Sequence, residues 1–366
     1  MTDRLTTMLH DEAATFDIPA APVDLVLADG RAIRRRRRTA GAVIGAAAAV
    51  AVVAAGVAAL VAVGSDKTPE PAKLPDQAAY EQHGAWARGD EVHVGNHTAT
   101  VRGAQDLHYT SAGVVVTTQD GYVLVTPAGD VEPVDLGVEV NPSTIGMGTF
   151  HQIATDATAP YLAYVRVGDD STAQAVVLDL STGEEHLADT PFRSDQGAGY
   201  VTSLWGDLLT YERGGTLRTV DWHTGKQSPG ETTGWFHQAG VDIDFNNEVG
   251  TWTLRSVRGE TLLTVASPYP ASSFGSLSPD GHYFAVSGLD PEITVYDIGT
   301  GDSVTIEDRV ASGYGWTPDG HLVGKRFPTG RSQVETCDPT TGSCEGTGVD
   351  VSGKMTLMEG LPGLVS

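Results

Sequence analysis

The chain has 366 residues, a length that is enough for one large β domain or about two average domains. Of these residues, 19% are charged and 7% are aromatic. Its formal net charge is −24, and the residues after 64 carry this acidic excess, so repulsion from phosphate excludes nucleic acid as their partner. The acidity suits solubility at a cell surface, and a cationic ligand or bound calcium is the alternative explanation. The 44 glycines exceed the average share of about 7% and indicate many tight turns between short strands.

Residues 1–38 are too few to bury a core, and we expect them to form a cytoplasmic N-terminal head. A short helix would end near Phe16, Pro19 and Pro22 would interrupt it, and an arginine run follows Gly30-Arg31. Together with the Ala/Val-rich segment that comes next, this layout resembles that of actinobacterial single-pass membrane proteins, some of which accompany extracytoplasmic-function sigma factors. The resemblance implies a regulatory contact for the head, whereas a disordered arm that only fixes topology is the simpler alternative.

Residues 39–64 contain no charge and predict one transmembrane helix, which would contact membrane lipid. From Ala40 to Gly64 there are 25 residues, which at about 1.5 Å each exceed a hydrocarbon layer of roughly 30 Å. Arginines precede the segment, so the positive-inside rule places the N-terminus in the cytoplasm and the C-terminal bulk outside. A cleaved signal peptide ending near Ala62-Val63-Gly64 is the alternative, although its apolar core would usually be about 7–15 residues. The orienting residues are Arg34, Arg35, Arg36, Arg37 and Arg38.

Residues 65–83 contain Pro69, Pro71 and Pro75 among scattered charges. This composition predicts a semi-extended spacer that holds the next domain away from the membrane. We expect residues 84–366 to form that domain outside the cytoplasm.

Two turn motifs repeat from residue 179 onward. Asp-x-x-Thr-Gly occurs four times at intervals of 42, 76 and 41 residues, and a degenerate copy at Val257–Glu260 fills the long interval. Pro-Asp-Gly-His occurs twice, 39 residues apart. Asp can accept hydrogen bonds from the backbone just after it, Gly tolerates a positive φ, and Pro fixes the first corner of a turn. The motif residues are Asp179 and Gly183, Asp221 and Gly225, Asp297 and Gly301, Asp338 and Gly342, Pro279, Asp280 and Gly281, and Pro318, Asp319 and Gly320.

A repeat of about 40–45 residues with four strands predicts the blade of a β-propeller, hence an all-β fold. Phe274–Gly281 and Gly315–Gly320 resemble the blade signature of WD40-like and TolB-like propellers. Six to seven blades fit the length, and we favour seven. Strands at Glu91–Val94 and Thr98–Val101 would then share a blade with strands near Val349–Leu357, which closes the ring. A β-sandwich is the alternative, but it gives no reason for the repeat spacing.

Cys337 and Cys344 are the two cysteines of the chain, and they flank one Asp-x-x-Thr-Gly turn. On opposite strands of a hairpin they could form a disulfide, which the oxidising side of the membrane would allow. Since the chain has no further cysteine, we do not expect a redox or metal role for the pair, and we expect no cofactor.

The sequence contains no motif that carries chemistry, such as His-Glu-x-x-His, a phosphate-binding loop or Gly-x-Ser-x-Gly. His282 and His321 occupy equivalent repeat positions, so we expect turn or strand-start residues there. Trp235, beside Phe236 and His237, is the least regular tryptophan and a candidate for a binding surface.

These observations predict a membrane-anchored propeller outside the cytoplasm that binds or scaffolds a protein, peptide or glycan without catalysis. One alternative is a propeller hydrolase or lyase at the cell surface that uses acidic loops such as Gly168-Asp169-Asp170 and Gly288-Leu289-Asp290. The other is a transmembrane regulator that links outer binding to a sigma-factor contact by the head.

Overall fold

A computed structural model describes most of the chain from residue 74 onward. The described ranges are 74–137, 153–168, 172–193, 200–213, 216–227, 236–246, 248–267, 274–288, 292–307, 309–326, 333–350 and 356–358. They all belong to one compact unit, Pro71–Ser366. Within these ranges, no helix is long and apolar enough to cross a membrane. The expected head at 1–38, with its arginines 34–38, and the expected transmembrane helix at 39–64 lie outside the described residues.

The described part contains one helix, α3 (Pro75–His83), and 29 strands. The strands are β1 (Ala85–Arg88), β2 (Glu91–Val94), β3 (His97–Thr100), β4 (Asp106–Thr110), β5 (Gly113–Thr118), β6 (Gly121–Val125), β7 (Val131–Val134), β8 (Ile153–Thr155), β9 (Tyr161–Val167), β10 (Thr172–Asp179), β11 (Glu185–Leu187), β12 (Phe192–Arg193), β13 (Val201–Trp205), β14 (Leu208–Arg213), β15 (Thr216–Asp221), β16 (Lys226–Gln227), β17 (Phe236–Gln238), β18 (Val241–Asn246), β19 (Thr251–Ser256), β20 (Thr261–Ala266), β21 (Phe274–Leu277), β22 (Tyr283–Ser287), β23 (Ile293–Asp297), β24 (Ser303–Ile306), β25 (Arg309–Trp316), β26 (Leu322–Arg326), β27 (Gln333–Cys337), β28 (Cys344–Asp350) and β29 (Thr356–Met358).

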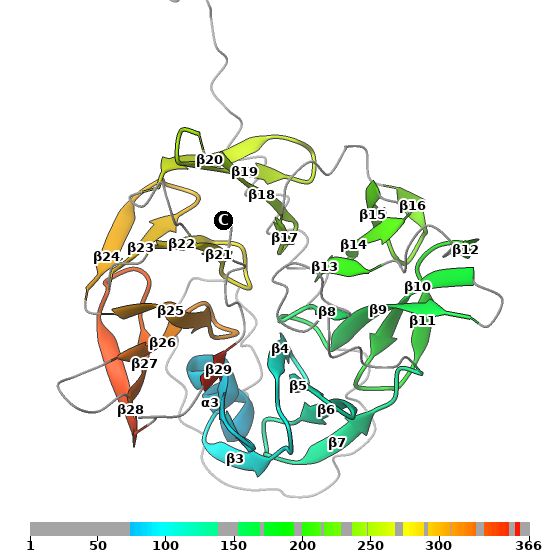
Figure 1. The fold of residues 1–366 in the computed structure, drawn as a ribbon, viewed down its shortest axis with the longest axis horizontal. Helices are drawn as coiled ribbons and strands as arrows, with labels where there is room; N and C mark the ends of the chain where they lie inside the picture. The colour runs from blue at the N-terminus through cyan, green and yellow to red at the C-terminus, as the bar shows by residue number, and fades with distance from the viewer. Residues whose placement is uncertain are drawn as a thin grey trace, which may run out of the picture. The chain divides into compact units, whose positions relative to one another are not determined.

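Seven antiparallel sheets are arranged in a ring, and each forms one blade of a β-propeller (Figure 1). Blade 1 consists of β29, β1, β2 and β3, in order from the centre of the ring outward. Blades 2 to 7 follow as β4–β7, β8–β12, β13–β16, β17–β20, β21–β24 and β25–β28. The structure thus confirms the all-β fold and the seven blades that the repeat spacing favours.

Blade 1 is built from both ends of the propeller sequence. β29 supplies its innermost strand and pairs antiparallel with β1, where Ala87 lies opposite Leu357. The sequence predicted a blade shared by the first and last segments, but it missed strand β1. It also placed Val349 in this blade, whereas that residue belongs to β28 of blade 7.

Blade 3 differs from the expected four strands. Its strand β10 has eight residues, long enough for two short strands to pair with its outer edge. β11 pairs with Val176–Leu178, and β12 pairs with Thr172 and Ala173. The other six blades have four strands each among the described residues.

The core lies between neighbouring blades, because the middle strands bury side chains on both faces. All six residues of β5 are buried, for example. Trp252 of blade 5 meets Phe284 of blade 6 edge-on, with ring centroids 5.5 Å apart. Gly275 makes room for this contact, because a Cβ atom there would lie 2.6 Å from the Phe284 ring. The tryptophans that are at most 2% exposed are Trp222, Trp252 and Trp316.

The expectation of a semi-extended spacer up to residue 83 is wrong for residues 75–83, which form helix α3. Pro75 begins the helix, where a missing N–H costs nothing, and Asp76 lies in its first turn. Gly84 ends it with a φ of +64°. The side chain of Tyr80 is fully buried. Burial of that ring against the blades, which local composition does not reveal, favours the helix over an extended chain.

Candidate functional site

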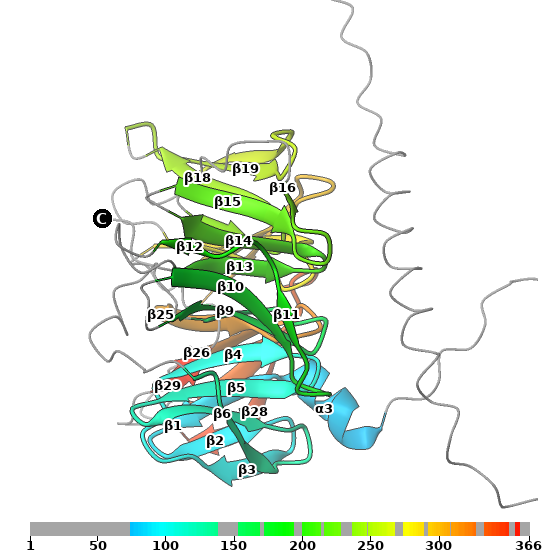
Figure 2. The same ribbon diagram turned by 90° about the vertical axis from the view of Figure 1, so that its right-hand side faces the viewer.

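The two ends of the ring carry different kinds of connection. Since successive strands of a blade run in opposite directions, the connections from first to second and from third to fourth strand lie at one end. We call this end the turn face. The connections from second to third strand and from blade to blade join strand ends at the opposite end, which we call the loop face. Figure 2 shows the turn face on the right, with α3 against it.

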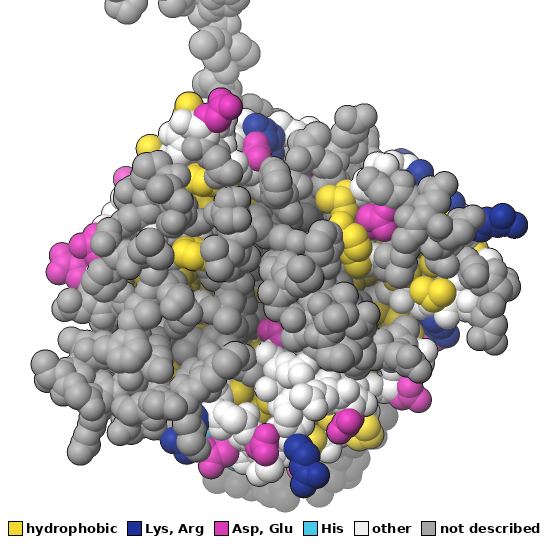
Figure 3. Space-filling view, viewed as in Figure 1, with side chains coloured by type: hydrophobic (Ala, Val, Ile, Leu, Met, Phe, Trp, Pro, Cys, Tyr) yellow, Lys and Arg dark blue, Asp and Glu magenta, His cyan; other side chains and the backbone are white. Residues whose placement is uncertain are grey.

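The connections of the two faces differ in regularity. Every connection on the turn face is described, and each has two to six residues. On the loop face, the connections from one blade to the next range from two residues, between β24 and β25, to eighteen, between β7 and β8. Figure 3 looks onto this end. The loop face therefore varies from blade to blade, while the turn face repeats.

The Asp-x-x-Thr-Gly motifs all lie on the turn face, between third and fourth strands. In each copy the Gly N–H donates to the Asp carbonyl oxygen at 2.7–2.9 Å, and the Gly φ is between +67° and +77°. The Asp carboxylate accepts the N–H two residues on, at 2.8–3.1 Å, and the Thr hydroxyl accepts the N–H two residues after it. Each invariant residue of the motif thus has a structural partner inside its own turn. The pairs are Asp179 and Gly183, Asp221 and Gly225, Asp297 and Gly301, and Asp338 and Gly342.

The Pro-Asp-Gly turns also lie on the turn face, between first and second strands. The hydroxyl before each proline donates to the aspartate two residues on, from Ser278 to Asp280 and from Thr317 to Asp319. The same hydroxyl then accepts the N–H of the histidine that follows the glycine. The motif read from the sequence, Pro279-Asp280-Gly281 with its copy Pro318-Asp319-Gly320, begins one residue after this hydroxyl residue and does not include it. His282 and His321 end these turns, and each directly precedes the second strand of its blade, β22 and β26, respectively.

Helix α3 is fixed to the turn face of three blades. The Tyr80 hydroxyl lies 2.8 Å from the carbonyl oxygens of Thr110 and Gly113 in blade 2. The Glu81 carbonyl accepts the N–H of Asp319 in blade 7 at 3.2 Å. Asp76 and His97 of blade 1 form a contact of 2.9 Å. Blade 1 has no connection between its first two strands, because β29 and β1 come from opposite ends of the sequence, and α3 bridges the blades on either side.

A tyrosine and an arginine on β9 bind a carboxylate on the outer strand of blade 3. The Tyr164 hydroxyl donates to Glu185 at 2.6 Å, and Arg166 donates to its other oxygen at 2.7 Å. These hydrogen bonds lower the pKa of Glu185. The cluster therefore holds an ionised carboxylate, which is a poor general acid at neutral pH.

The same Tyr-x-Arg pattern on β14 joins blade 4 to blade 3. The Tyr211 hydroxyl donates to Asp189, and Arg213 donates to the same oxygen at 3.0 Å. Arg213 also lies 5.0 Å from the ring centre of Phe192. Burial favours a higher pKa for Asp189, but hydrogen bonds from Tyr211 and Thr190 and the charge of Arg213 outweigh it and lower that pKa. The repeat of Tyr-x-Arg, at Tyr164 and Tyr211, is the sequence signal that could have revealed these two carboxylate contacts.

An aromatic cluster on the turn face covers the boundary of blades 3 and 4. Trp222 donates from Nε1 to the Gly206 carbonyl at 2.8 Å, and the His223 ring lies 3.6 Å from the Trp222 ring. Tyr161 and His186 of blade 3 pack on the same indole, at 5.1 and 5.3 Å. Because Trp222 is 2% exposed, this cluster serves as packing between blades.

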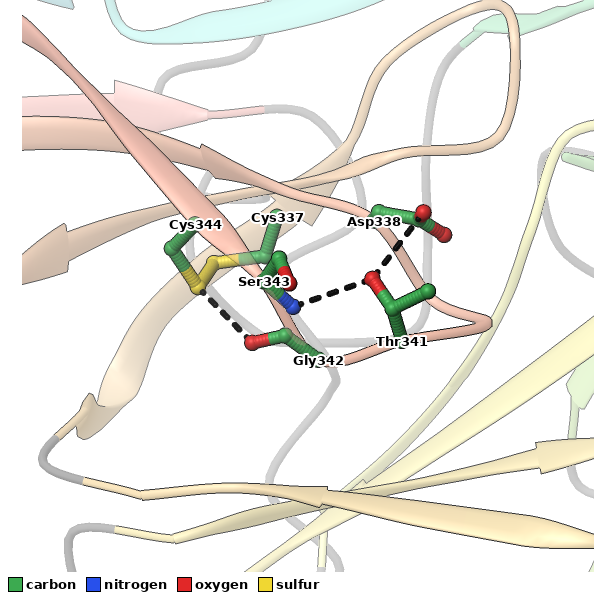
Figure 4. Close-up of a disulfide and its surroundings, with 6 residues drawn as sticks. All are labelled: Cys337, Asp338, Thr341, Gly342, Ser343 and Cys344. Carbon is green, nitrogen blue, oxygen red and sulfur yellow. Dashed lines mark hydrogen bonds between the residues drawn. A yellow bond between two sulfur atoms is a disulfide. The ribbon is translucent and has the colours of Figure 1, made fainter.

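The cysteines lie on the turn face of blade 7, because Cys337 ends β27 and Cys344 begins β28. Figure 4 shows them beside the turn that joins these strands. Cys337 and Cys344 are joined by a disulfide and occupy directly opposite positions of β27 and β28, with Cα atoms 4.0 Å apart. The turn between them is held by Thr341, whose hydroxyl donates to Asp338 and accepts the N–H of Ser343. The cysteine pair is thus able to form a disulfide, as expected. Glu335, which the sequence motifs do not single out, lies beside the two sulfurs.

The acidic-loop residues Asp169, Asp170 and Asp290, which a hydrolase or lyase would use, lie outside the described residues. Trp235, the candidate for a binding surface, also lies outside them.

Comparisons with known proteins give little beyond this geometry. No protein-family model and no curated protein matches the chain. Among solved structures, a candidate 6-phosphogluconolactonase from Bacteroides uniformis is 14% identical, with a TM-score of 0.42, and the match covers 76% of this chain and 97% of that one. Hsv2 from Kluyveromyces lactis is 13% identical, with a TM-score of 0.42, over 64% of this chain and 74% of its own.

Proposed function

We propose that the chain is a membrane-anchored binding or scaffolding propeller that presents its loop face to a protein, peptide or glycan outside the cytoplasm. The difference between the two faces carries this proposal. The turn face is occupied by short turns that satisfy their own polar groups and by α3. The loop face carries connections that differ in length from blade to blade. Irregular connections on a rigid scaffold are where binding residues are commonly found.

The anchor in this proposal is the uncharged segment 39–64, oriented by the arginines at 34–38. Ten residues, 65–74, separate that segment from α3. At about 3.5 Å per residue they reach at most about 35 Å. Because α3 is fixed to the turn face, this short tether would keep the turn face towards the membrane. The loop face would then point away from it, towards partners outside the cell.

The cysteine pair supports a location of the propeller in oxidising surroundings. Disulfides form and persist outside the cytoplasm and are rare within it. Cys337 and Cys344 face each other at directly opposite positions of one hairpin. Their placement supports an extracytoplasmic propeller, and hence a protein, peptide or glycan of the cell exterior as the ligand.

Arrays of defined peptides and glycans, probed with residues 71–366, test the binding function. Each ligand found is then measured against two variants. One replaces residues 228–235, between β16 and β17 on the loop face, by Gly and Ser, and the other carries Asp302→Asn on the turn face. We expect at least a tenfold loss of affinity in the loop-face variant and little change in the other. Equal losses would contradict the proposal, and turnover of the ligand would favour a hydrolase or lyase.

A further inference from the structure

A buried carboxylate lies beside the two cysteines of blade 7. Glu335 precedes Cys337 by two residues on β27, so the two side chains share one face of the strand. A carboxylate oxygen of Glu335 and the sulfurs of Cys337 and Cys344 all lie within 4.8 Å of one another. Glu335 is 4% exposed and Cys337 is 3% exposed, while Cys344 is half-buried. Three side chains of metal-ligating type therefore converge at one largely buried point.

The hairpin holds the cysteines together through its backbone. Cys337 and Cys344 are partners in the β27–β28 ladder. Directly beyond them, the N–H of Asp338 donates to the carbonyl of Ser343 at 2.9 Å, and the N–H of Gly342 donates to the carbonyl of Asp338 at 2.9 Å. Neither bond involves sulfur, so we expect reduced thiols at these positions to remain neighbours.

Two thiolates and a carboxylate form a ligand set for a zinc-class cation. Zn²⁺ binds Cys sulfur and Glu oxygen in tetrahedral sites, and a site with three protein ligands leaves the fourth position to water. Thiolate ligands select such borderline-soft cations over Ca²⁺ and Mg²⁺, which take oxygen ligands.

We propose that the reduced hairpin of blade 7 binds one zinc-class divalent cation through Glu335, Cys337 and Cys344. A dithiol reductant gives the disulfide two electrons and two protons, and becomes a disulfide itself, so that both cysteines end as thiols. Metal binding then releases the two thiol protons and forms two metal–sulfur bonds and one metal–oxygen bond. Because the same sulfurs take part in either state, the disulfide and the metal exclude each other. This inference is independent of the ligand proposed for the loop face.

Cobalt(II) added to the full chain in detergent solution tests the site directly. The chain is first reduced anaerobically with a phosphine, which is then removed. We expect thiolate-to-cobalt charge-transfer absorption that saturates at one metal per chain, disappears on addition of Zn²⁺, and is absent from the oxidised chain. Reduced chain without this absorption would overturn the proposal.

Two variants with the same change of charge separate the site from the rest of the hairpin. Glu335→Gln removes the proposed oxygen ligand, and we expect it to weaken cobalt binding at least tenfold. Glu345→Gln is the control, because Glu345 is exposed and lies opposite Thr336, one residue from Cys344 on the other face of the hairpin. We expect unchanged affinity there. Equal affinity in Glu335→Gln and the unaltered chain would remove Glu335 from the site and overturn the proposal.

A measurement on the unaltered chain covers the case in which Glu335→Gln does not fold. Thiol alkylation by iodoacetamide is followed in the reduced chain with and without Zn²⁺. We expect Zn²⁺ to slow the alkylation of both cysteines at least tenfold, whereas Mg²⁺ leaves the rate unchanged. Equal rates with the two cations would contradict a site for zinc-class metals.

Discussion

The turn face and the loop face of this propeller differ in the regularity of the connections between their strands. On the turn face, the backbone groups of each repeated turn are paired by Asp, Thr, Ser and Gly residues of the same turn, and every connection has two to six residues. On the loop face, the connections between blades range from two to eighteen residues. The motifs that stand out in this sequence therefore belong to the scaffold. The candidate recognition surface is where the repeat breaks down.

The largest effect we expect on the turn face comes from Tyr80→Ala. The Tyr80 side chain is fully buried, and its hydroxyl lies 2.8 Å from two carbonyl oxygens of blade 2. Truncation of a buried aromatic ring to alanine costs about 3–5 kcal/mol. We expect a loss of that size in the free energy of unfolding of residues 71–366, measured by urea denaturation. Gln77→Ala on the same helix is the control, with a change of at most about 0.5 kcal/mol.

If Tyr80→Ala lowered the free energy of unfolding as little as the control does, α3 would not contribute to the stability of the propeller. The tether would then not hold the turn face towards the membrane, because α3 would not be firmly fixed to that face.

Gly275→Ala tests packing between blades, away from both faces. An added Cβ would lie 2.6 Å from the Phe284 ring and 3.0 Å from that of Trp252. Overpacking of this kind costs about 1–3 kcal/mol. We expect a loss in that range by urea denaturation. Gly183→Ala, whose Cβ meets nothing within 4 Å, would lose only the roughly 1 kcal/mol of a left-handed backbone. An equal loss in both variants would show that steric crowding is not what Gly275 relieves.

Asp189→Asn should weaken the contact of blades 3 and 4 and change its pH dependence. Asn exchanges charge-assisted hydrogen bonds from Tyr211 and Arg213 for neutral ones, which costs about 1 kcal/mol. The folded-state pKa of Asp189 is lowered, so its contribution is present above the unfolded pKa of about 3.9 and is lost as pH falls below it. We expect the stability of the two proteins to converge between about pH 4 and pH 2. A difference in stability between the two proteins that stays constant down to pH 2 would contradict a stabilising role of the ionised Asp189.

Asp297→Ala removes one carboxylate from a repeated turn. It leaves the N–H groups of Gly299 and Thr300 without this acceptor, at an exposed site where water can replace it. We expect a loss of about 0.5–1.5 kcal/mol in the free energy of unfolding. Asp302→Asn in the same turn serves as the control. A loss well above this range would show that the turn has partners beyond its own residues.

The smallest effect on stability should come from the loop face. Replacement of residues 228–235 by Gly and Ser should lower the free energy of unfolding less than any of the changes above, because it alters none of the strands of the blades. The same variant should lose ligand binding. A large loss of stability here would mean that the loop face belongs to the scaffold after all.

The fold could be predicted from the sequence because turn chemistry is local. Asp297, Thr300 and Gly301 act on backbone groups within a few residues, so their spacing in the sequence reveals the blade period. Helix α3 could not be found in this way, since Tyr80 gains its partners from blade 2. Glu335 was missed for the same reason, because β pairing brings Cys344 to it across a turn.

Energy transfer to the bilayer tests the account most directly. The full chain is reconstituted in liposomes that carry an acceptor lipid, with Cys337→Ser and Cys344→Ser as background. A donor dye is attached at Asp120→Cys or Asp130→Cys, two exposed positions of blade 2 on the loop face and the turn face, respectively. We expect stronger transfer from residue 130 than from residue 120. Equal or reversed efficiencies would contradict the proposed orientation, and no transfer from either position would contradict the membrane anchor.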